Sequence, residues 1–354
     1  MTVDPTTPEG WAQRWQPTIA ERPSRRVIDA HTHMLVPESA EMTRHHFKPE
    51  MDPRSFFSAP DSKELNSRFY QLVADKFTDP ASRVADMDAL GVDTQLVGLS
   101  PFHFFYWADE QLAPKVVSLQ NDRIAELCAH DPERLVGIGT LPWAHPALAV
   151  DAAEQVKQDH GFPGVYTGAD INGVDLDDPR FEPVWEALAA LGLVVIMHPA
   201  GFTHGQRLTD YYLVNVIGMP LSSTLTVTRM ILGGVFERHP GLRMLVMHGG
   251  GYLPFYSART DHAFRHRPEL RKNIDRLPSE FLGDLYYDIC VFDPGMVEHL
   301  VQRFGADHVL LGTDYPFDMG LPDPLALVEA SQLSPSERDM IVGGSAERLF
   351  GLVP

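Results

Sequence analysis

The chain has 354 residues, of which 44% are hydrophobic and 22% are charged, a composition typical of a folded globular protein. Its formal net charge of −19 repels phosphate backbones and disfavours nucleic acid as a partner. No run of about 18 apolar residues is present, so neither a membrane-spanning helix nor a membrane partner is expected. Residues 1–25 lack the apolar core of a signal peptide, so a cytoplasmic location is expected. Cys128 and Cys290 are expected to be buried thiols, because no disulfide framework or CxxC motif is present.

Short runs rich in Val, Leu and Ile alternate with segments of helical periodicity along the chain. Runs with so little polar alternation are typical of parallel strands that are covered on both faces. Eight strands are predicted, over Val27–Ala30, Thr94–Leu99, Leu135–Thr140, Gly164–Thr167, Leu193–Met197, Arg243–Met247, Leu285–Cys290 and Val309–Gly312.

Helices are predicted between these strands. The best marked of them opens at Thr78-Asp79-Pro80, where proline suits the first helical position, and closes at Gly91. Glycine also follows several of the others, as the C-terminal ends of helices prefer. The others are predicted over Lys115–His130, Leu148–His160, Phe181–Ala190, Ser223–Arg238, Phe255–Arg265, Gly295–Phe304 and Ser336–Leu349.

Strands that alternate with helices in this way predict an α/β fold, a (β/α)8 TIM-type barrel. We expect one barrel domain over residues 26–354, preceded by an N-terminal arm, residues 1–25. An open doubly wound sheet is the alternative, although no GxGxxG motif follows the first strand. Two long segments interrupt the alternation, an insertion over residues 34–77 and a shorter one over Gly201–Ser222. Such segments at strand C-termini usually shape a substrate pocket, and surface decoration is the alternative interpretation.

Five titratable side chains stand at the ends of four predicted strands. His31 and His33 follow the first strand, His198 the fifth, His248 the sixth and Asp314 the eighth. Residues two apart on an extended chain face the same side, so the first two imidazoles can bind one ion. Because all strand C-termini of a barrel open onto one face, the five groups are expected to converge there.

Three imidazoles and one carboxylate suit a borderline divalent ion and leave a coordination position open for water or substrate. A single histidine after an apolar strand is more often an ordinary core or loop residue than a ligand. Repetition at four separate strands makes coincidence a poor explanation. No lysine lies within the predicted strands, so one metal is expected rather than a pair bridged by a carboxylated lysine.

Several motifs together resemble the amidohydrolase superfamily, specifically its decarboxylase-like branch. The resemblance extends from about Val27 to Phe350. It is densest in His248-Gly249-Gly250-Gly251, in Arg259 with Asp261 and Arg265-His266-Arg267, and in Gly312-Thr313-Asp314-Tyr315-Pro316-Phe317.

The resemblance implies one divalent metal ion, zinc with manganese as the alternative, bound by His31, His33, His198 and Asp314. It implies that His248 acts as the acid/base beside metal-bound water, with Asp314 also counted as catalytic. These roles rest on the resemblance and not on spacing alone.

Substrate contacts are also implied by the resemblance. Arg259 resembles an arginine that a neighbouring subunit contributes to bind the substrate carboxylate, which implies a homodimer. Phe317 resembles an aromatic pocket wall. Arg68 is the candidate for a second substrate-binding arginine, and a solvated loop charge is the equally good alternative.

One position departs from the decarboxylase-like pattern. The resemblance implies tryptophan two residues after the fifth-strand histidine, where this chain has Ala200. The pocket is therefore expected to be wider or differently filled there. The aromatic run after the second strand could replace the missing wall or could anchor its own loop; it comprises Phe102, Phe104, Phe105, Tyr106 and Trp107.

The expected function is therefore a metal-dependent decarboxylase, a carbon–carbon lyase acting on a small unsaturated or aromatic carboxylic acid. The ligand set alone equally allows a hydrolase of a lactone, ester or amide, or a hydratase. A catalytically idle barrel that binds a metal or a small acid is the alternative outside enzymes.

Overall fold

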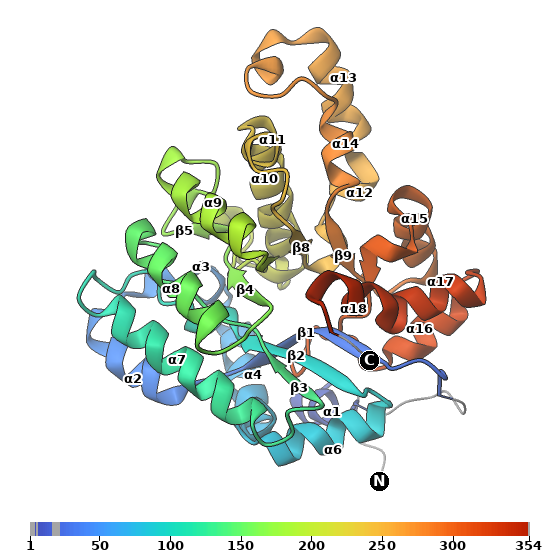
Figure 1. The fold of residues 1–354 in the computed structure, drawn as a ribbon. Helices are drawn as coiled ribbons and strands as arrows, with labels where there is room; N and C mark the ends of the chain where they lie inside the picture. Colours follow the sequence, from blue (N-terminus) through green and yellow to red (C-terminus); the bar gives the residue numbers. More distant parts are fainter. Residues whose placement is uncertain (1–3, 5, 16–21, 353–354) are drawn as a thin grey trace.

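The computed structural model describes residues 4, 6–15 and 22–352, and eight parallel strands stand at the centre of these residues (Figure 1). All eight predicted strands are present, several of them shorter than expected. They are β1 (Ile28–Met34), β2 (Thr94–Leu99), β3 (Leu135–Gly137), β4 (Gly164–Thr167), β7 (Val194–Met197), β8 (Met244–Val246), β9 (Tyr286–Asp288) and β10 (Val309–Leu310).

Hydrogen bonding divides these strands into two parallel sheets, in the orders β1-β2-β3 and β10-β9-β8-β7-β4. Both edges are joined. Gly139, two residues after β3, bridges to Val165 of β4, and Thr32 of β1 bridges to Tyr315, in the segment after β10. The amide of Ala30 also donates to the carbonyl of Leu311, with N and O 2.9 Å apart. The strands therefore close into a barrel, which confirms the predicted α/β barrel and rules out the open sheet.

The first strand is longer than the sequence suggests. The prediction ended it at Ala30, but β1 continues to Met34 and contains both His31 and His33. Its pairing with β2 shifts register between Asp29 and Thr32 and then resumes. The apolar pattern stops where side chains become polar, while the backbone ladder continues, because hydrogen bonding does not depend on side-chain polarity.

Helices surround the barrel, and the marked one, α6 (Pro80–Leu90), begins and ends where predicted. The Asp79 carboxylate accepts from the amides of Ala81 and Ser82, and Gly91 ends the helix at φ +73°. The other main helices of the described residues are α7 (Ala113–Cys128), α8 (Pro146–Gln158), α9 (Glu182–Leu191), α10 (Met219–Leu232), α15 (Pro294–Phe304) and α16 (Pro324–Ala330).

Three predicted helices are each divided. Residues 223–238 form α10 and α11 (Val235–Arg238), because Gly234 adopts φ +79° between them. Residues 255–265 belong to α12 (Leu253–Tyr256) and α13 (Ala258–His266). The last predicted helix is α17 (Pro335–Asp339), a π-helical turn η10 (Met340–Gly344) and α18 (Ser345–Phe350).

The two insertions contain short elements that periodicity does not define. Residues 34–77 form α2 (Pro37–Thr43), η1 (Arg44–His46), η2 (Pro49–Met51), α3 (Pro53–Phe56), α4 (Pro60–Leu72) and most of α5 (Ala74–Thr78). The second insertion forms η5 (Gly205–Arg207), η6 (Val214–Gly218) and the first turn of α10. A hairpin of β5 (Asp170–Ile171) and β6 (Val174–Asp175) was not predicted.

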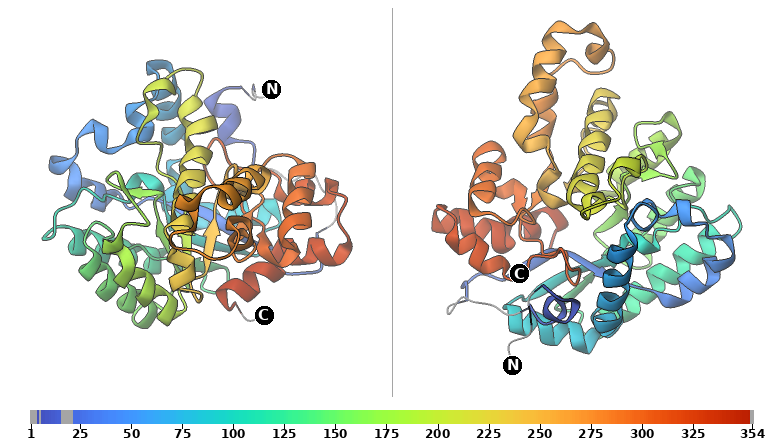
Figure 2. Two further views of the ribbon diagram at one scale, coloured as in Figure 1. Left: turned by 90° about the horizontal axis from the view of Figure 1, so that it is seen from above. Right: turned by 180° about the vertical axis from the view of Figure 1, so that it is seen from behind.

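One helical region stands away from the barrel. Figures 1 and 2 show α13, drawn in orange, projecting beyond the other helices together with η8 (Pro268–Arg271) and α14 (Pro278–Leu282). Projecting helices of this kind offer surface to another molecule, and Arg259 lies on this projection.

The described part of the N-terminal arm packs on the barrel. It contains α1 (Pro8–Ala12), and Trp15 beyond it is buried with its ring centroid 5.0 Å from that of Tyr315. Arg14 donates to the carbonyl of Phe317 at 2.7 Å. The arm therefore contacts the loop after β10, while residues 1–3, 5 and 16–21 lie outside the described residues.

Two further expectations concern the cysteines and membrane-spanning helices. Cys128 and Cys290 are both buried free thiols, as predicted. Across the described ranges, none of the helices is long and apolar enough to cross a membrane.

Candidate active site

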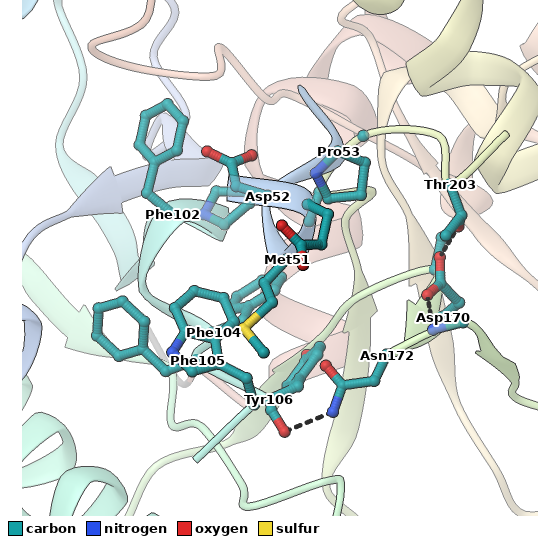
Figure 3. A pocket seen from close by; sticks show the side chains of 17 residues that line it. Met51, Asp52, Pro53, Phe102, Phe104, Phe105, Tyr106, Asp170, Asn172 and Thr203 are labelled. Atoms are coloured by element: carbon teal, nitrogen blue, oxygen red, sulfur yellow. Dashed lines mark hydrogen bonds between the residues drawn. The ribbon is translucent and has the colours of Figure 1, made fainter. Parts of the chain in front are cut away.

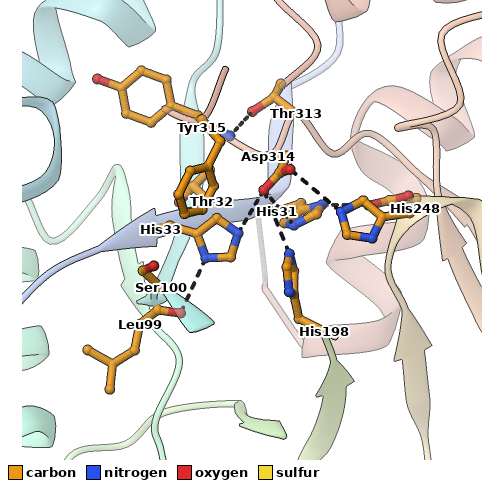
Figure 4. Close-up of polar contacts among 12 residues, drawn as sticks. His31, Thr32, His33, Leu99, Ser100, His198, His248, Thr313, Asp314 and Tyr315 are labelled. Carbon is orange, nitrogen blue, oxygen red and sulfur yellow. Dashed lines mark hydrogen bonds and ion pairs between the residues drawn. The ribbon is translucent and has the colours of Figure 1, made fainter. Parts of the chain in front are cut away.

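Four side chains meet at the C-terminal mouth of the barrel (Figure 4). One ligand atom each from His31, His33, His198 and Asp314 lies within 4.8 Å of all the others, and all four residues are buried. Oδ1 of Asp314 is the common neighbour, at 3.2 Å from Nε2 of His31, 2.9 Å from Nε2 of His33 and 3.7 Å from Nε2 of His198. The structure thus brings together the four residues expected to bind metal.

The second nitrogen of each imidazole is held by an oxygen atom. Nδ1 of His31 lies 2.6 Å from Oδ2 of Asp288. Nδ1 of His33 lies 3.2 Å from the carbonyl oxygen of Leu99, and Nδ1 of His198 lies 2.8 Å from that of Pro199. A carbonyl only accepts, so His33 and His198 carry their proton on Nδ1 and direct the Nε2 lone pair to the centre. Nε2 of His31 and of His198 is buried without a hydrogen bond to any described residue. Buried ring nitrogens without a hydrogen bond that converge on a carboxylate fit the binding of one divalent ion.

The protonation states agree with that fit. Burial lowers the pKa of His33 to about 4 and that of His198 well below its usual value, so both rings are neutral at pH 7. Burial would raise the pKa of Asp314, but the surrounding imidazoles, His31 first, hold it well below its usual range. Burial would lower the pKa of His31, but Asp314 and Asp288 outweigh it and raise the pKa to about 10. The two carboxylates therefore favour a positive charge at this point, which a divalent cation would supply.

His248 lies beside the cluster rather than within it. Its Nε2 is 3.5 Å from Oδ2 of Asp314, and its ring centroid is 4.8 Å from that of His198. Its Nδ1 is buried without a hydrogen-bond partner among the described residues. The ring is thus placed to exchange a proton with a molecule bound next to the four ligand atoms.

The three glycines after His248 are required by the turn that carries it. His248 has φ +57°, and the following glycines have φ +59°, +76° and +64°. A Cβ atom on Gly249 would collide with Val291, and one on Gly251 would collide with the carbonyl of Pro220. A run of left-handed backbone in such close contact needs glycine. The His-Gly-Gly-Gly motif therefore positions the imidazole.

Two buried carboxylates that were not predicted as site residues hold this arrangement. Asp288 of β9 contacts His31 through Oδ2 and accepts the Gly249 amide through Oδ1 at 2.7 Å, which links β1 to the His248 turn. Asp29 accepts the amide and the hydroxyl of Thr313 at 3.0 and 2.6 Å, and thereby holds the loop that carries Asp314. The sequence feature that could have identified Asp29 and Asp288 is an acidic residue inside a predicted strand that is otherwise apolar.

The structure does not bring Arg68 to this site. Its side chain is 63% exposed on α4 and pairs with Glu9. Arg54, from the same insertion, lines a cavity of about 30 Å³ together with His198 and Asp314. Its guanidinium lies 3.4 Å from the ring centroid of Phe102. Sequence reasoning missed Arg54, because the contacts that fold the insertion have no periodic signature.

Of the other two predicted substrate contacts, Phe317 lies at the site and Arg259 does not. Phe317 lines that small cavity, and its ring centroid is 5.0 Å from that of His33. Arg259 is exposed on α13 and lines none of the cavities described here. A second, more open cavity of about 400 Å³ reaches His248 and Asp314. Its apolar rim includes Val216, Tyr252, Phe255, Phe292 and Met296, each at least 36% exposed.

Comparison with known proteins places the chain in a family. The Amidohydrolase family profile matches residues 28–352. The chain belongs to the amidohydrolase family. A curated relative, 2-amino-3-carboxymuconate-6-semialdehyde decarboxylase of Dictyostelium discoideum, is 33% identical over 292 residues, which cover 82% of this chain and 81% of the relative. This likeness places the chain in the decarboxylase branch of the family.

Solved structures show the same fold. The 5-carboxyvanillate decarboxylase of Sphingomonas paucimobilis superimposes with a TM-score of 0.82 at 23% identity, covering 93% of this chain and 100% of that one. A 5-carboxyvanillate decarboxylase of Novosphingobium aromaticivorans, complexed with manganese and 4-hydroxy-3-methoxy-5-nitrobenzoic acid, also gives 0.82, at 21% identity over 96% and 99% of the two chains.

Proposed function

We propose that this amidohydrolase-family protein is a metal-dependent decarboxylase of a small aromatic or unsaturated carboxylic acid. The observation that carries the proposal is the convergence of four metal-ligand atoms beside a free imidazole, His248, and an arginine, Arg54. The decarboxylase relatives of similar length support the same reaction.

One metal ion is proposed at the cluster. His31, His33, His198 and Asp314 would hold it, as zinc or manganese, because both accept imidazole and carboxylate ligands. Such an ion supplies a Lewis acid and lowers the pKa of bound water. Manganese is bound in one of the structural relatives, which supports the same choice here.

His248 is the proposed proton donor. In decarboxylation the bond between carbon and the carboxylate breaks, its electron pair stays on the carbon, and a proton must be added there while CO2 leaves. The imidazole of His248 adjoins the cluster, and its Nδ1 has no partner among the described residues, so the ring is free to carry that proton. Asp314 is proposed to orient His248 as well as to bind the metal.

Arginines are proposed to bind the substrate carboxylate. Arg54 lies on the wall shared with Asp314 and Phe317, where a guanidinium can donate two parallel hydrogen bonds to a carboxylate. Phe317 is proposed as an apolar wall for the planar acid. Arg68 is not part of this proposal, because its exposed side chain pairs with Glu9.

We also propose a homodimer in which Arg259 of a second copy completes the site. Its exposed position on the projecting α13 supports this, as does the exposed apolar rim around the cavity that reaches His248. Within each copy we propose a single domain over residues 26–354, with residues 34–77 forming part of the substrate wall.

A substrate screen tests the proposal. Protein loaded with manganese or zinc would be incubated with small aromatic and unsaturated carboxylic acids, and CO2 release and ultraviolet absorbance would be followed. Lactones and esters belong in the same panel. CO2 release that His248→Asn abolishes supports a decarboxylase, whereas cleavage of a lactone without CO2 from any acid would support a hydrolase instead.

A further inference from the structure

Figure 3 shows a large cavity with aromatic side chains in its wall. Its volume is about 410 Å³. We call it the aromatic side cavity; its lining includes the aromatic run of Phe102, Phe104, Phe105, Tyr106 and Trp107, and also Met51 and Pro53 of the first insertion. Neither Arg54 nor Phe317, the proposed contacts to the reacting acid, lines this space.

The side cavity adjoins the reacting end of the site. It shares Pro101, Phe102 and Ala200 with the small cavity that contains His198 and Asp314. Ala200 follows His198 by two residues, and its methyl group lines both spaces together with Phe102. A large side chain at position 200 would occupy space along both cavities, which alanine does not.

The polar groups of the wall set limits on what can enter. The charged lining residues are all acidic, namely Glu50, Asp52 and Asp170. Asp170 already accepts from the hydroxyl of Thr203 at 2.9 Å and from the amide of Gly173 at 2.6 Å. With no lysine, arginine or histidine among its lining residues, the cavity would repel a second carboxylate on the substrate.

The volume of the cavity and its mostly apolar lining favour binding of an apolar ring, or of an apolar chain of about the same size. A cavity of roughly 150 Å³ is enough to hold benzene, so this one can hold a phenyl group with further substituents. Trp107 adds one polar contact, because its indole nitrogen is buried without a hydrogen-bond partner among the described residues. An ether or keto oxygen on an apolar substituent could accept from it.

We propose that the aromatic side cavity binds an uncharged, apolar or aromatic extension of the substrate acid, and so selects acids larger than a single substituted ring. That the substrate is a carboxylic acid rests on the proposed decarboxylase function. The extension enters past Ala200 and Phe102 while the carboxylate stays at Arg54. Ala200 and Met51 are then specificity-determining positions.

Binding measurements test this without turnover. Manganese-loaded protein would be titrated calorimetrically with 2-hydroxybenzoate and with its 4-phenyl and 5-phenyl derivatives. We expect at least one phenyl derivative to bind about tenfold more tightly than the parent, because burial of the phenyl ring is favourable. Ala200→Trp and Met51→Trp each fill the cavity from a different wall and should reduce that preference to about twofold or less.

The control is Leu65→Trp, which adds the same side chain at an exposed position of α4 outside the cavity. It should keep the preference. Equal affinity of parent and phenyl derivatives in the unmodified protein would overturn the proposal, as would a preference that survives in both cavity variants. CO2 release is scored separately: preferential binding with no CO2 from any acid would refute the decarboxylase function and leave the cavity assignment intact.

Discussion

The metal-ligand cluster and the aromatic side cavity are neighbours that are built in opposite ways. The cluster takes its side chains from the ends of β1, β7 and β10, and an oxygen atom fixes the second nitrogen of each imidazole. The cavity takes its walls from η2 and the residues after it, from the loop after β2, from the segment after β4 that includes β5, and from the loop after β7, mostly with apolar side chains. The difference indicates that the barrel fixes the chemistry, while loops set which acid reaches it.

Loss of a ligand should break the cluster most severely. His198→Ala removes a neutral imidazole whose Nε2 is one of the four ligand atoms that converge at the centre. We expect metal content to fall far below that of the unmodified protein and CO2 release to fall to background. Elemental analysis of purified protein measures the first quantity, and retention of full metal content would contradict the assignment.

Substitution of His248 should lower the catalytic rate without changing metal binding. His248→Asn should lower kcat by about 10²- to 10⁴-fold, the usual contribution of a general acid or base. Metal content should stay unchanged, because His248 lies outside the four ligands. Parallel loss of metal would instead make His248 a ligand.

Asp288, which contacts Nδ1 of His31, should affect the affinity of the site for its metal ion. Asp288→Asn keeps the shape but weakens the contact with Nδ1 of His31, so metal affinity should fall by about 10- to 100-fold. Asp284→Asn is the control, since Asp284 is an exposed partner of Arg276. Competition with a chelator of known affinity gives both values, and equal values would remove Asp288 from the site.

The substrate wall should respond in KM rather than in metal content. Arg54→Met removes the guanidinium proposed to bind the carboxylate and should raise KM by about 10- to 50-fold, as expected for loss of a charged hydrogen bond. Arg68→Met, from the same insertion, removes an exposed ion pair and should change KM by less than about twofold. A larger effect at Arg68 would restore it as the substrate-binding arginine.

The same contrast explains what could be predicted from the sequence. The strands and the four residues of the cluster were predictable, because parallel strands are apolar and polar side chains at their ends interrupt that pattern. The end of β1 was misplaced, since His31 and His33 interrupt the pattern without ending the strand. Arg54 could not be separated from Arg68, because burial within an insertion depends on tertiary contacts that leave no period in the sequence.

A metal titration tests the central claim most directly. Protein stripped with a chelator would be titrated with manganese while CO2 release from an accepted acid is recorded. We predict no release from the stripped protein, and a rate that rises until about one equivalent per chain is bound and then stays constant, as one three-histidine, one-aspartate site requires. Full activity in the stripped protein, or a rate that continues to rise to a second equivalent, would contradict the account.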